Sequence, residues 1–191
     1  MSNREIPQFK WPALETERLI LRKFTYDDLN DISEYASNPE ITKYVQWEAH
    51  RSKTETLEFL NIVVEMYIKH RPAPWGIELK EEKKIIGTIG FTKIFPEEFS
   101  CEVGYTLSQN YWNRGLMTEA LKKILEYGFD VMDLNSIIAH CIVENEQSAK
   151  VLLKSGMNYV KTVKGNLMVK GNMVDVKLFS LSKKEFKLLK Y

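Results

Sequence analysis

The chain has 191 residues, 44% of them hydrophobic and 28% charged, and we expect residues 1–191 to form one globular domain with a single core. Its 27 basic and 26 acidic side chains give a net charge of +1, which excludes a strongly basic nucleic-acid-binding protein and predicts no nucleic-acid partner. The sequence has no run of ~18 apolar residues and no apolar signal-peptide stretch at its start, so we expect a soluble, cytoplasmic protein without membrane contact.

The N-terminal third predicts one strand and two helices. Leu19 and Leu21 share one face of a segment that alternates apolar and polar side chains, the pattern of a half-buried strand. Asn38-Pro39 ends the helical pattern that follows, and Ser52 with Glu55 has the capping-box spacing that opens the next helix. The expected bounds are residues 15–23 for the strand and residues 26–36 and 53–69 for the helices.

The rest of the chain predicts more strands than helices. The expected strands are residues 75–79, 85–94, 101–108, 136–143, 157–163 and 174–181. The expected helices are residues 117–132 and 145–155, and a loop containing Gly165, Gly171 and Asn172 joins the last two strands. Helices that alternate with strands, together with hairpin-like connections, favour an α+β fold: one mixed, mostly antiparallel sheet with helices on both faces.

The most informative segment is YWNRGLMTEA, residues 111–120, which lies between a predicted strand and a predicted helix. A glycine-containing turn that opens a helix presents unpaired backbone N–H groups and the positive end of the helix dipole, and both suit a phosphate. The alternative is an ordinary strand-to-helix turn in which Gly115 provides backbone freedom.

Five blocks of sequence, in the correct order, resemble the GNAT superfamily of acetyl-CoA-dependent N-acetyltransferases. They are TERLILRKFTYDDLNDI, NPEITKYVQW, EVGY, YWNRGLMTEAL and VENEQS followed by KSGM. The fourth block is similar to the Q/R-x-x-G-x-G/A pyrophosphate loop, and the first and last resemble the branch that acetylates ribosomal-protein N-termini. The resemblance covers nearly the whole chain and implies the GNAT fold, acetyl-CoA as the cofactor and a primary amine as the substrate.

The resemblance also implies a place for each part of the cofactor. The pantetheine arm is expected along Tyr105, Thr106 and Leu107, and the diphosphate on the amides of Asn113, Arg114, Gly115, Leu116, Met117 and Thr118. Asn145 and Ser148 match a pair that faces the pantetheine and the sulfur, with Ser148 as the implied proton donor to the thiolate. From the residues alone, Asn145 is also a helix N-cap.

The general base is the position that the resemblance leaves open. Some relatives place a glutamate two residues before the x-Asn-Gly turn of the last hairpin, where this chain has Leu167. Glu102 is the leading replacement because it lies on the strand beside the expected thioester, and Glu144 is the second. Either could equally be a solvated or ion-paired carboxylate. The bulky Met117 is a second departure, and it bears on how closely a phosphate approaches the turn.

The remaining reactive and aromatic residues have simpler interpretations. We expect His140 to be a packed mid-strand histidine rather than a base. Cys101 and Cys141 are expected to be reduced core thiols, because direct attack by an amine needs no acyl-cysteine and neither residue has metal-ligand spacing. Tyr44 and Trp47 lie in the segment that matches the acceptor groove and are the substrate-site candidates. No metal is expected.

The predicted function is transfer of acetyl from acetyl-CoA to a primary amine by direct attack in a ternary complex. A protein N-terminal α-amine, such as that of a ribosomal protein, is favoured in a site without a strong base. About 10% of such an amine is neutral at pH 7, against roughly one lysine in 2,500. The alternatives are acetylation of a polyamine, antibiotic or metabolite, a non-catalytic acetyl-CoA sensor, and a protein that binds another nucleotide. Dimers are frequent in the branch resembled, so a homodimer is among the expected states.

Overall fold

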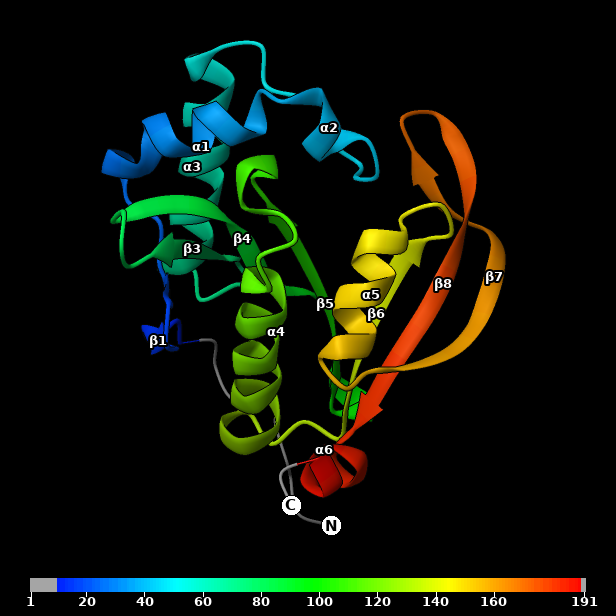
Figure 1. Ribbon diagram of the computed structural model, residues 1–191. Helices are drawn as coiled ribbons and strands as arrows, with labels where there is room; N and C mark the ends of the chain where they lie inside the picture. Colours follow the sequence, from blue (N-terminus) through cyan, green and yellow to red (C-terminus); the bar gives the residue numbers. More distant parts are fainter. Residues whose placement is uncertain (1–9, 190–191) are drawn as a thin grey trace.

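The computed structural model describes residues 10–189; residues 1–9 and 190–191, part of the predicted domain, lie outside this range. Its strands are β1 (Leu14–Glu15), β2 (Leu19–Arg22), β3 (Trp75–Leu79), β4 (Lys84–Phe95), β5 (Ser100–Leu107), β6 (Ser136–Ile142), β7 (Asn158–Val169) and β8 (Asn172–Ser182). They form one sheet in the order β1-β2-β3-β4-β5-β6-β8-β7, in which only the β5–β6 pair is parallel (Figure 1). The predicted mixed, mostly antiparallel sheet is confirmed.

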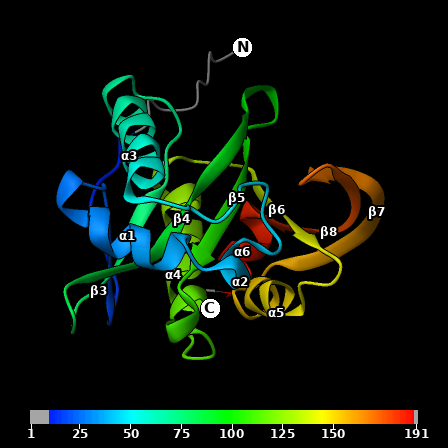
Figure 2. The same ribbon diagram turned by 90° about the horizontal axis from the view of Figure 1, so that it is seen from above.

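Helices lie on both faces of this sheet, as predicted. They are α1 (Leu29–Ala36), α2 (Pro39–Thr42), α3 (Lys53–Ile68), α4 (Leu116–Glu126), α5 (Glu146–Lys154) and α6 (Lys183–Leu189). In the view from above, α4 and α5 lie on one side of the sheet and α3 on the other (Figure 2). A π-helical turn, Tyr127–Val131, follows α4 directly, so the helical segment ends close to residue 132, as predicted. Within residues 10–189, every helix is too short or too polar to span a bilayer.

The core fills the space between the sheet and these helices. Leu19 and Leu21 are fully buried on one face of β2, as the alternation predicted. Trp75 is fully buried at the start of β3, and its ring packs edge-on against Tyr127 with the centroids 5.6 Å apart. Helix α4 buries an apolar stripe along its whole length, and each large side chain buried in this way contributes about 1.5–3 kcal/mol.

Strands β5 and β6 stay together over only three residue pairs. Ser100, Cys101 and Glu102 pair with Ser136–Ile138, and beyond that point the strands diverge (Figure 1). Strand β4 accompanies β5 on its other edge as far as Leu107. In the described part of the chain, no strand therefore lies beside the β6-facing edge of β5 after Glu102. We call this divergence the fork and the Glu102–Ile138 pair its apex.

The first predicted strand is divided in two. Residues 16–18 form a tight turn between β1 and β2, in which Thr16 N–H donates to the Leu19 carbonyl oxygen (3.0 Å). The break predicted at Asn38-Pro39 is the start of the short α2, where the Asn38 side chain accepts from Glu40 N–H (3.0 Å).

The loop predicted between the last two strands is wrong. Strand β7 continues to Val169, and only Lys170 and Gly171, with φ of 48° and 83°, form the hairpin turn. Gly165, at φ 53°, lies in an irregular stretch of β7, where its N–H donates to Asp175 Oδ1 of β8 (2.8 Å). A glycine that accommodates a bulge lets the strand continue, whereas in sequence it is indistinguishable from a loop residue.

Candidate active site

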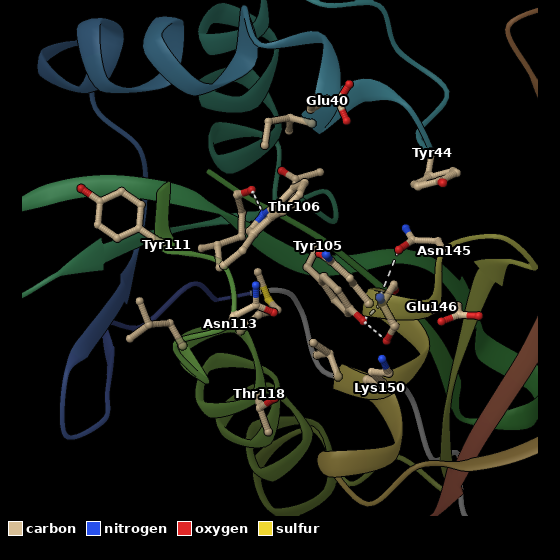
Figure 3. A pocket seen from close by; sticks show the side chains of 18 of the residues that line it. Glu40, Tyr44, Tyr105, Thr106, Tyr111, Asn113, Thr118, Asn145, Glu146 and Lys150 are labelled. Carbon is tan, nitrogen blue, oxygen red and sulfur yellow. Dashed lines mark hydrogen bonds between the residues drawn. The ribbon is translucent and has the colours of Figure 1, made fainter. Parts of the chain in front are cut away.

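A groove of about 610 Å³ opens between α2, the start of α4 and α5, at the wide end of the fork (Figure 3). All residues predicted to bind the cofactor line it except Arg114, whose guanidinium lies over the Tyr111 ring (5.4 Å). Of the two substrate-site candidates, Tyr44 lines the groove. Trp47 does not, and instead packs against the core with its ring 5.5 Å from that of His50.

The turn before α4 has the backbone that a phosphate site needs. Asn113 and Gly115 are both left-handed, at φ 61° and 75°, and Gly115 is the N-cap of α4. The bond from Glu119 N–H to the Gly115 carbonyl oxygen (3.1 Å) is the first of the helix. The N–H groups of residues 116–118 therefore have no partner within α4, and they add to the positive end of the helix dipole.

Glu119 stabilises this turn, although the sequence analysis did not predict a role for it. Its carboxylate accepts from Thr16 Oγ1 (2.6 Å), Arg18 N–H (2.9 Å) and Arg18 Nε (2.7 Å), and Arg18 Nη1 also donates to the Arg114 carbonyl oxygen (3.0 Å). Burial alone would raise the pKa of Glu119, but these hydrogen bonds and the guanidinium charge hold it below its ordinary value. An acidic residue in the first turn of a helix is the signal that could have identified it.

Met117 belongs to the core as well as to the groove lining. Its side chain is only 5% exposed and packs with the main hydrophobic cluster. Most of the side chain is thus buried in the core beneath α4.

Tyr105 and Ser148 form a hydroxyl pair at the groove. The Tyr105 ring points from β5 toward α5, with its oxygen 3.0 Å from Ser148 Oγ (Figure 3). Burial raises the pKa of Tyr105, so the phenol stays protonated at neutral pH. Asn145 Oδ1 accepts from Ser148 N–H (3.1 Å), which confirms Asn145 as the N-cap of α5. The sequence missed the hydroxyl of Tyr105, because only the main chain of β5 was considered there.

Glu102 lies outside the groove lining, at the apex of the fork. Oε1 is 3.0 Å from His140 Nδ1, so His140 has a carboxylate partner. Oε2 is buried and has no hydrogen-bond partner among the described residues, although Lys93 Nζ is 3.5 Å away. Glu144, the second candidate, lines the groove.

The two cysteines are free and buried, as the sequence predicted. Burial raises the pKa of the Cys101 thiol to about 12 and also raises that of Cys141, so neither ionises readily. Among residues 10–189, no three His, Cys, Asp or Glu side chains are grouped in a way that could hold a metal ion.

Leu167 lies in a small apolar cluster beside the groove. The buried members are Ile142, Val169 and Val176, and the half-buried ones are Tyr44, Val163, Leu167 and Val174. We call this cluster the apolar wall. Residues 158–173 contain no Asp or Glu, so sliding the alignment by a residue or two brings no carboxylate to this position.

Comparison with known proteins gives the family. A family model described as acetyltransferase (GNAT) domain matches residues 18–158. The chain belongs to this family. It is 33% identical over 174 residues to a protein named uncharacterized N-acetyltransferase p20 of Bacillus licheniformis, covering 91% of this chain and 98% of that one. It is 26% identical to the [ribosomal protein uS5]-alanine N-acetyltransferase of Escherichia coli (strain K12), covering 88% and 90%.

Solved GNAT structures have the same fold. An acetyltransferase of the GNAT family from Bacillus anthracis superimposes with a TM-score of 0.81 at 29% identity, covering 91% of this chain and 99% of that one. A spermidine N-acetyltransferase from Vibrio cholerae, in complex with CoA and spermine, gives a TM-score of 0.75 at 21% identity, covering 90% and 99%, and supports the fold alone. The GNAT fold of this chain is confirmed, and the chain is an acetyl-CoA-dependent N-acetyltransferase.

The residues of the groove fit acetyl-CoA. The unpaired N–H groups at the start of α4 would hold its diphosphate, with the ammonium groups of Lys150 and Lys154 in the same lining. The free edge of β5 beyond Glu102 would pair with the amides of the pantetheine arm. Acetyl-CoA supplies an acyl carbon on a thiol leaving group, so the chain has to hold the reactants and move two protons.

Proposed function

We propose that the acceptor is the α-amine at the N-terminus of a protein, with a ribosomal protein as the first candidate. The observation that carries this proposal is the apolar wall, whose half-buried members include Tyr44 of the groove lining. The first side chains of a peptide can bury apolar surface against such a wall, whereas a polyamine has no branching side chain to place there. The name of the 26% identical Escherichia coli relative supports the same class of acceptor.

The charge of the groove supports an acceptor with one positive group. Its lining contains three carboxylates, Glu40, Glu144 and Glu146, and three ammonium groups, Lys43, Lys150 and Lys154. In the free protein the two signs balance in this lining, whereas a polycationic substrate is recognised by an excess of negative charge.

Beside the apolar wall, the loop after α2 is joined to the β7–β8 hairpin, an arrangement that would suit a thin chain end. Gln46 Nε2 donates to the Met168 carbonyl oxygen (3.2 Å), and Lys170 Nζ contacts both Thr42 Oγ1 (3.3 Å) and Glu48 Oε2 (3.2 Å). These contacts join the loop after α2 to the tip of the β7–β8 hairpin. An extended N-terminus would enter beneath this bridge more readily than a folded surface.

Two proton transfers complete the proposed mechanism. Ser148, hydrogen-bonded to the protonated Tyr105, would donate to the leaving sulfur. Glu102 would provide the negative charge for the proton that the amine releases. We favour it over Glu144 because Glu102 is at the apex of the fork, with a side chain only 13% exposed. A carboxylate withdrawn from water interacts more strongly with a positive charge.

The test measures thiol release from acetyl-CoA with a panel of amines. The panel contains a peptide with a free N-terminus, the same peptide with its N-terminus blocked and one internal lysine, spermidine, and an aminoglycoside. We expect the free peptide to accelerate release and the blocked peptide to leave it at the rate without acceptor. Acceleration by spermidine or the aminoglycoside but not by the free peptide would replace the proposal with a small-amine acceptor.

A further inference from the structure

The pairing of Glu102 with His140 joins the two arms of the fork where they separate. Glu102 is the last residue of β5 that pairs with β6, and His140 is two residues beyond its partner Ile138 on β6. The hydrogen bond between Glu102 Oε1 and His140 Nδ1 (3.0 Å) therefore spans the apex. The mechanism proposed above uses the carboxylate of this pair and leaves the imidazole without a role.

The chemistry of the pair fixes the state of the imidazole. An ionised carboxylate can only accept hydrogen bonds, so the bond to Glu102 requires the hydrogen to be on Nδ1. In a neutral imidazole, Nε2 then carries the free lone pair. Nε2 has no hydrogen-bond partner in the described part of the chain, and the side chain of His140 is 22% exposed. This is the arrangement of a carboxylate that orients a histidine base.

The surroundings of the pair leave Glu102 Oε2 buried and without a hydrogen bond among the described residues. Strand β4 has an irregular register between Phe91 and Lys93, which places Lys93 directly opposite Glu102. Lys93 Nζ lies 3.5 Å from Oε2 without forming a hydrogen bond, and its side chain is 63% exposed, so this ion pair is weak. On the other side, β8 places Leu178 opposite His140. Bulges are frequent next to active sites, where they redirect a side chain.

The two proton-handling pairs lie on opposite faces of the fork. Successive side chains alternate along a strand, and Tyr105 faces α5, so Glu102 faces the other side of β5. Three residues of strand separate these two positions by about 10 Å. A proton donor, the leaving sulfur, the amine nitrogen and a base, each about 3 Å from the next, span about 9 Å.

We propose that His140 Nε2 accepts the proton of the attacking amine, and that Glu102 acts through His140 as a positioning residue. This inference rests on the proposed function. As the N–C bond forms and the C–S bond breaks, the proton on nitrogen moves to Nε2 and the sulfur takes a proton from Ser148 Oγ. Ser148 recovers its proton from water through Tyr105, and the imidazolium of His140 returns one to water. Glu102 keeps the hydrogen on Nδ1 and balances the positive charge of the ring.

The test compares His140→Asn, Glu102→Gln and their combination. Asparagine retains a donor near the position of Nδ1 and removes Nε2, so we expect kcat/KM for the peptide to fall by about 100-fold. Glu102→Gln should lower it by about 10-fold, and the double variant should be no slower than His140→Asn, because the two residues act as one unit. Imidazole added to His140→Ala should restore part of the rate. His70→Asn, the same change on the loop after α3, is the control and should leave kcat/KM unchanged.

A second measurement needs no turnover. In protein labelled with [15N]histidine, long-range proton–nitrogen NMR distinguishes the two imidazole tautomers, and His140→Asn identifies the His140 signal. We expect the Nδ1–H tautomer in the wild type and its partial loss in Glu102→Gln.

The results separate this inference from the proposed function. If Glu102→Gln is inactive while His140→Asn keeps the wild-type kcat/KM, the carboxylate takes the proton directly and the inference is wrong, although the proposed function stands. If no amine accelerates thiol release in the wild type, the proposed function fails. The NMR measurement of the His140 tautomer still tests the inference in that case, and an Nε2–H imidazole would overturn it.

Discussion

At the scale of single residues, the hydroxyl pair of Tyr105 and Ser148 carries one half of the proposed chemistry. Removing the Ser148 hydroxyl removes the donor nearest the expected sulfur. We expect Ser148→Ala to lower kcat by about 100-fold, the usual contribution of a general acid, with little change in the Kd of acetyl-CoA. Thiol release gives kcat and calorimetry gives Kd.

The control for this variant is Ser155→Ala at the opposite end of the same helix. The Ser155 hydroxyl donates to the Val151 carbonyl oxygen (2.8 Å) and lies outside the groove lining. It should lose a little stability and no activity. An equal loss of kcat in both serine variants would show that Ser148 acts through the stability of α5 rather than through its proton.

Glu119 gives a prediction about pH. Burial raises the pKa of this carboxyl, but the hydrogen bonds from Thr16 and Arg18 lower it further, and the net shift is downward. Its stabilising contribution is therefore complete above the unfolded-state pKa of about 4.3 and is lost as the pH falls through the lower folded-state value. We expect Glu119→Gln to lower the free energy of unfolding by about 1 kcal/mol at pH 7, discounted because Arg18 is partly exposed.

Urea unfolding of wild type and variant at pH 7 and near pH 3 measures this difference. The difference in the free energy of unfolding between the two proteins should narrow in acid, because the contribution of the carboxylate begins to be lost below the unfolded-state pKa. Glu126→Gln removes an exposed partner of Lys123 at the other end of α4 and should change stability little at either pH. A gap for Glu119→Gln that is unchanged in acid would contradict the assignment.

At the scale of elements, the turn before α4 can be tested with a matched pair of glycines. Gly115 and Gly165 both have a positive φ, 75° and 53°, and an added Cβ would meet nothing closer than 3.6 Å at Gly115 and nothing within 4 Å at Gly165. Replacing either by alanine should thus destabilise the protein mainly through backbone strain, by about 1 kcal/mol. Only Gly115→Ala should also weaken acetyl-CoA binding, because it moves the N–H groups at the start of α4. Equal Kd values in the two variants would argue against a phosphate at this turn.

Elements with a strong local pattern were predictable from the sequence. Strand β3 has the bounds that were predicted, and α3 begins after Ser52, whose hydroxyl accepts from Glu55 N–H (3.3 Å) as the capping-box spacing indicated. Strand β7 was not predictable, because its continuation through Gly165 depends on Asp175, ten residues further along the chain.

The candidate site also has parts that local sequence predicts and parts that depend on residues far apart in the chain. The turn around Gly115 and the cap at Asn145 depend on neighbours in sequence, and the structure brings both to the groove. The partner of His140 is 38 residues away on β5, so a single strand pattern could only indicate a packed histidine. The prediction for Trp47 was wrong because its ring packs against His50 and the core instead of lining the groove. This orientation depends on tertiary packing, which a local sequence pattern does not contain.

At the scale of the whole molecule, the fork predicts where a ligand changes the protein. The β6-facing edge of β5 after Glu102 has no strand beside it in the described chain, so we expect its amides to exchange with solvent faster than those of β8. Acetyl-CoA should slow exchange at residues 103–107. Residues 176–180 of β8, paired on both sides by β6 and β7, serve as the internal control and should not respond.

The single domain predicted for residues 1–191 has its own test at this scale. Calorimetry should give one cooperative transition, with a calorimetric enthalpy equal to the van't Hoff enthalpy. Acetyl-CoA at a concentration of 100 Kd should raise the free energy of unfolding by about 2.7 kcal/mol. The single transition should then occur at a higher temperature and remain single. Two transitions, of which the ligand moves only one, would indicate that the arms of the fork unfold separately.

The donors at the start of α4 belong to the main chain, and this has a consequence for how the sequence can change. A side-chain donor disappears with one substitution, whereas a backbone N–H is present in every residue except proline. If acetyl-CoA is held as we propose, its recognition is encoded in the path of the chain rather than in the identity of residues 116–118. The apolar wall, in contrast, is made of side chains alone. Amino-acid substitutions would then change the specificity for the amine more readily than the specificity for acetyl-CoA.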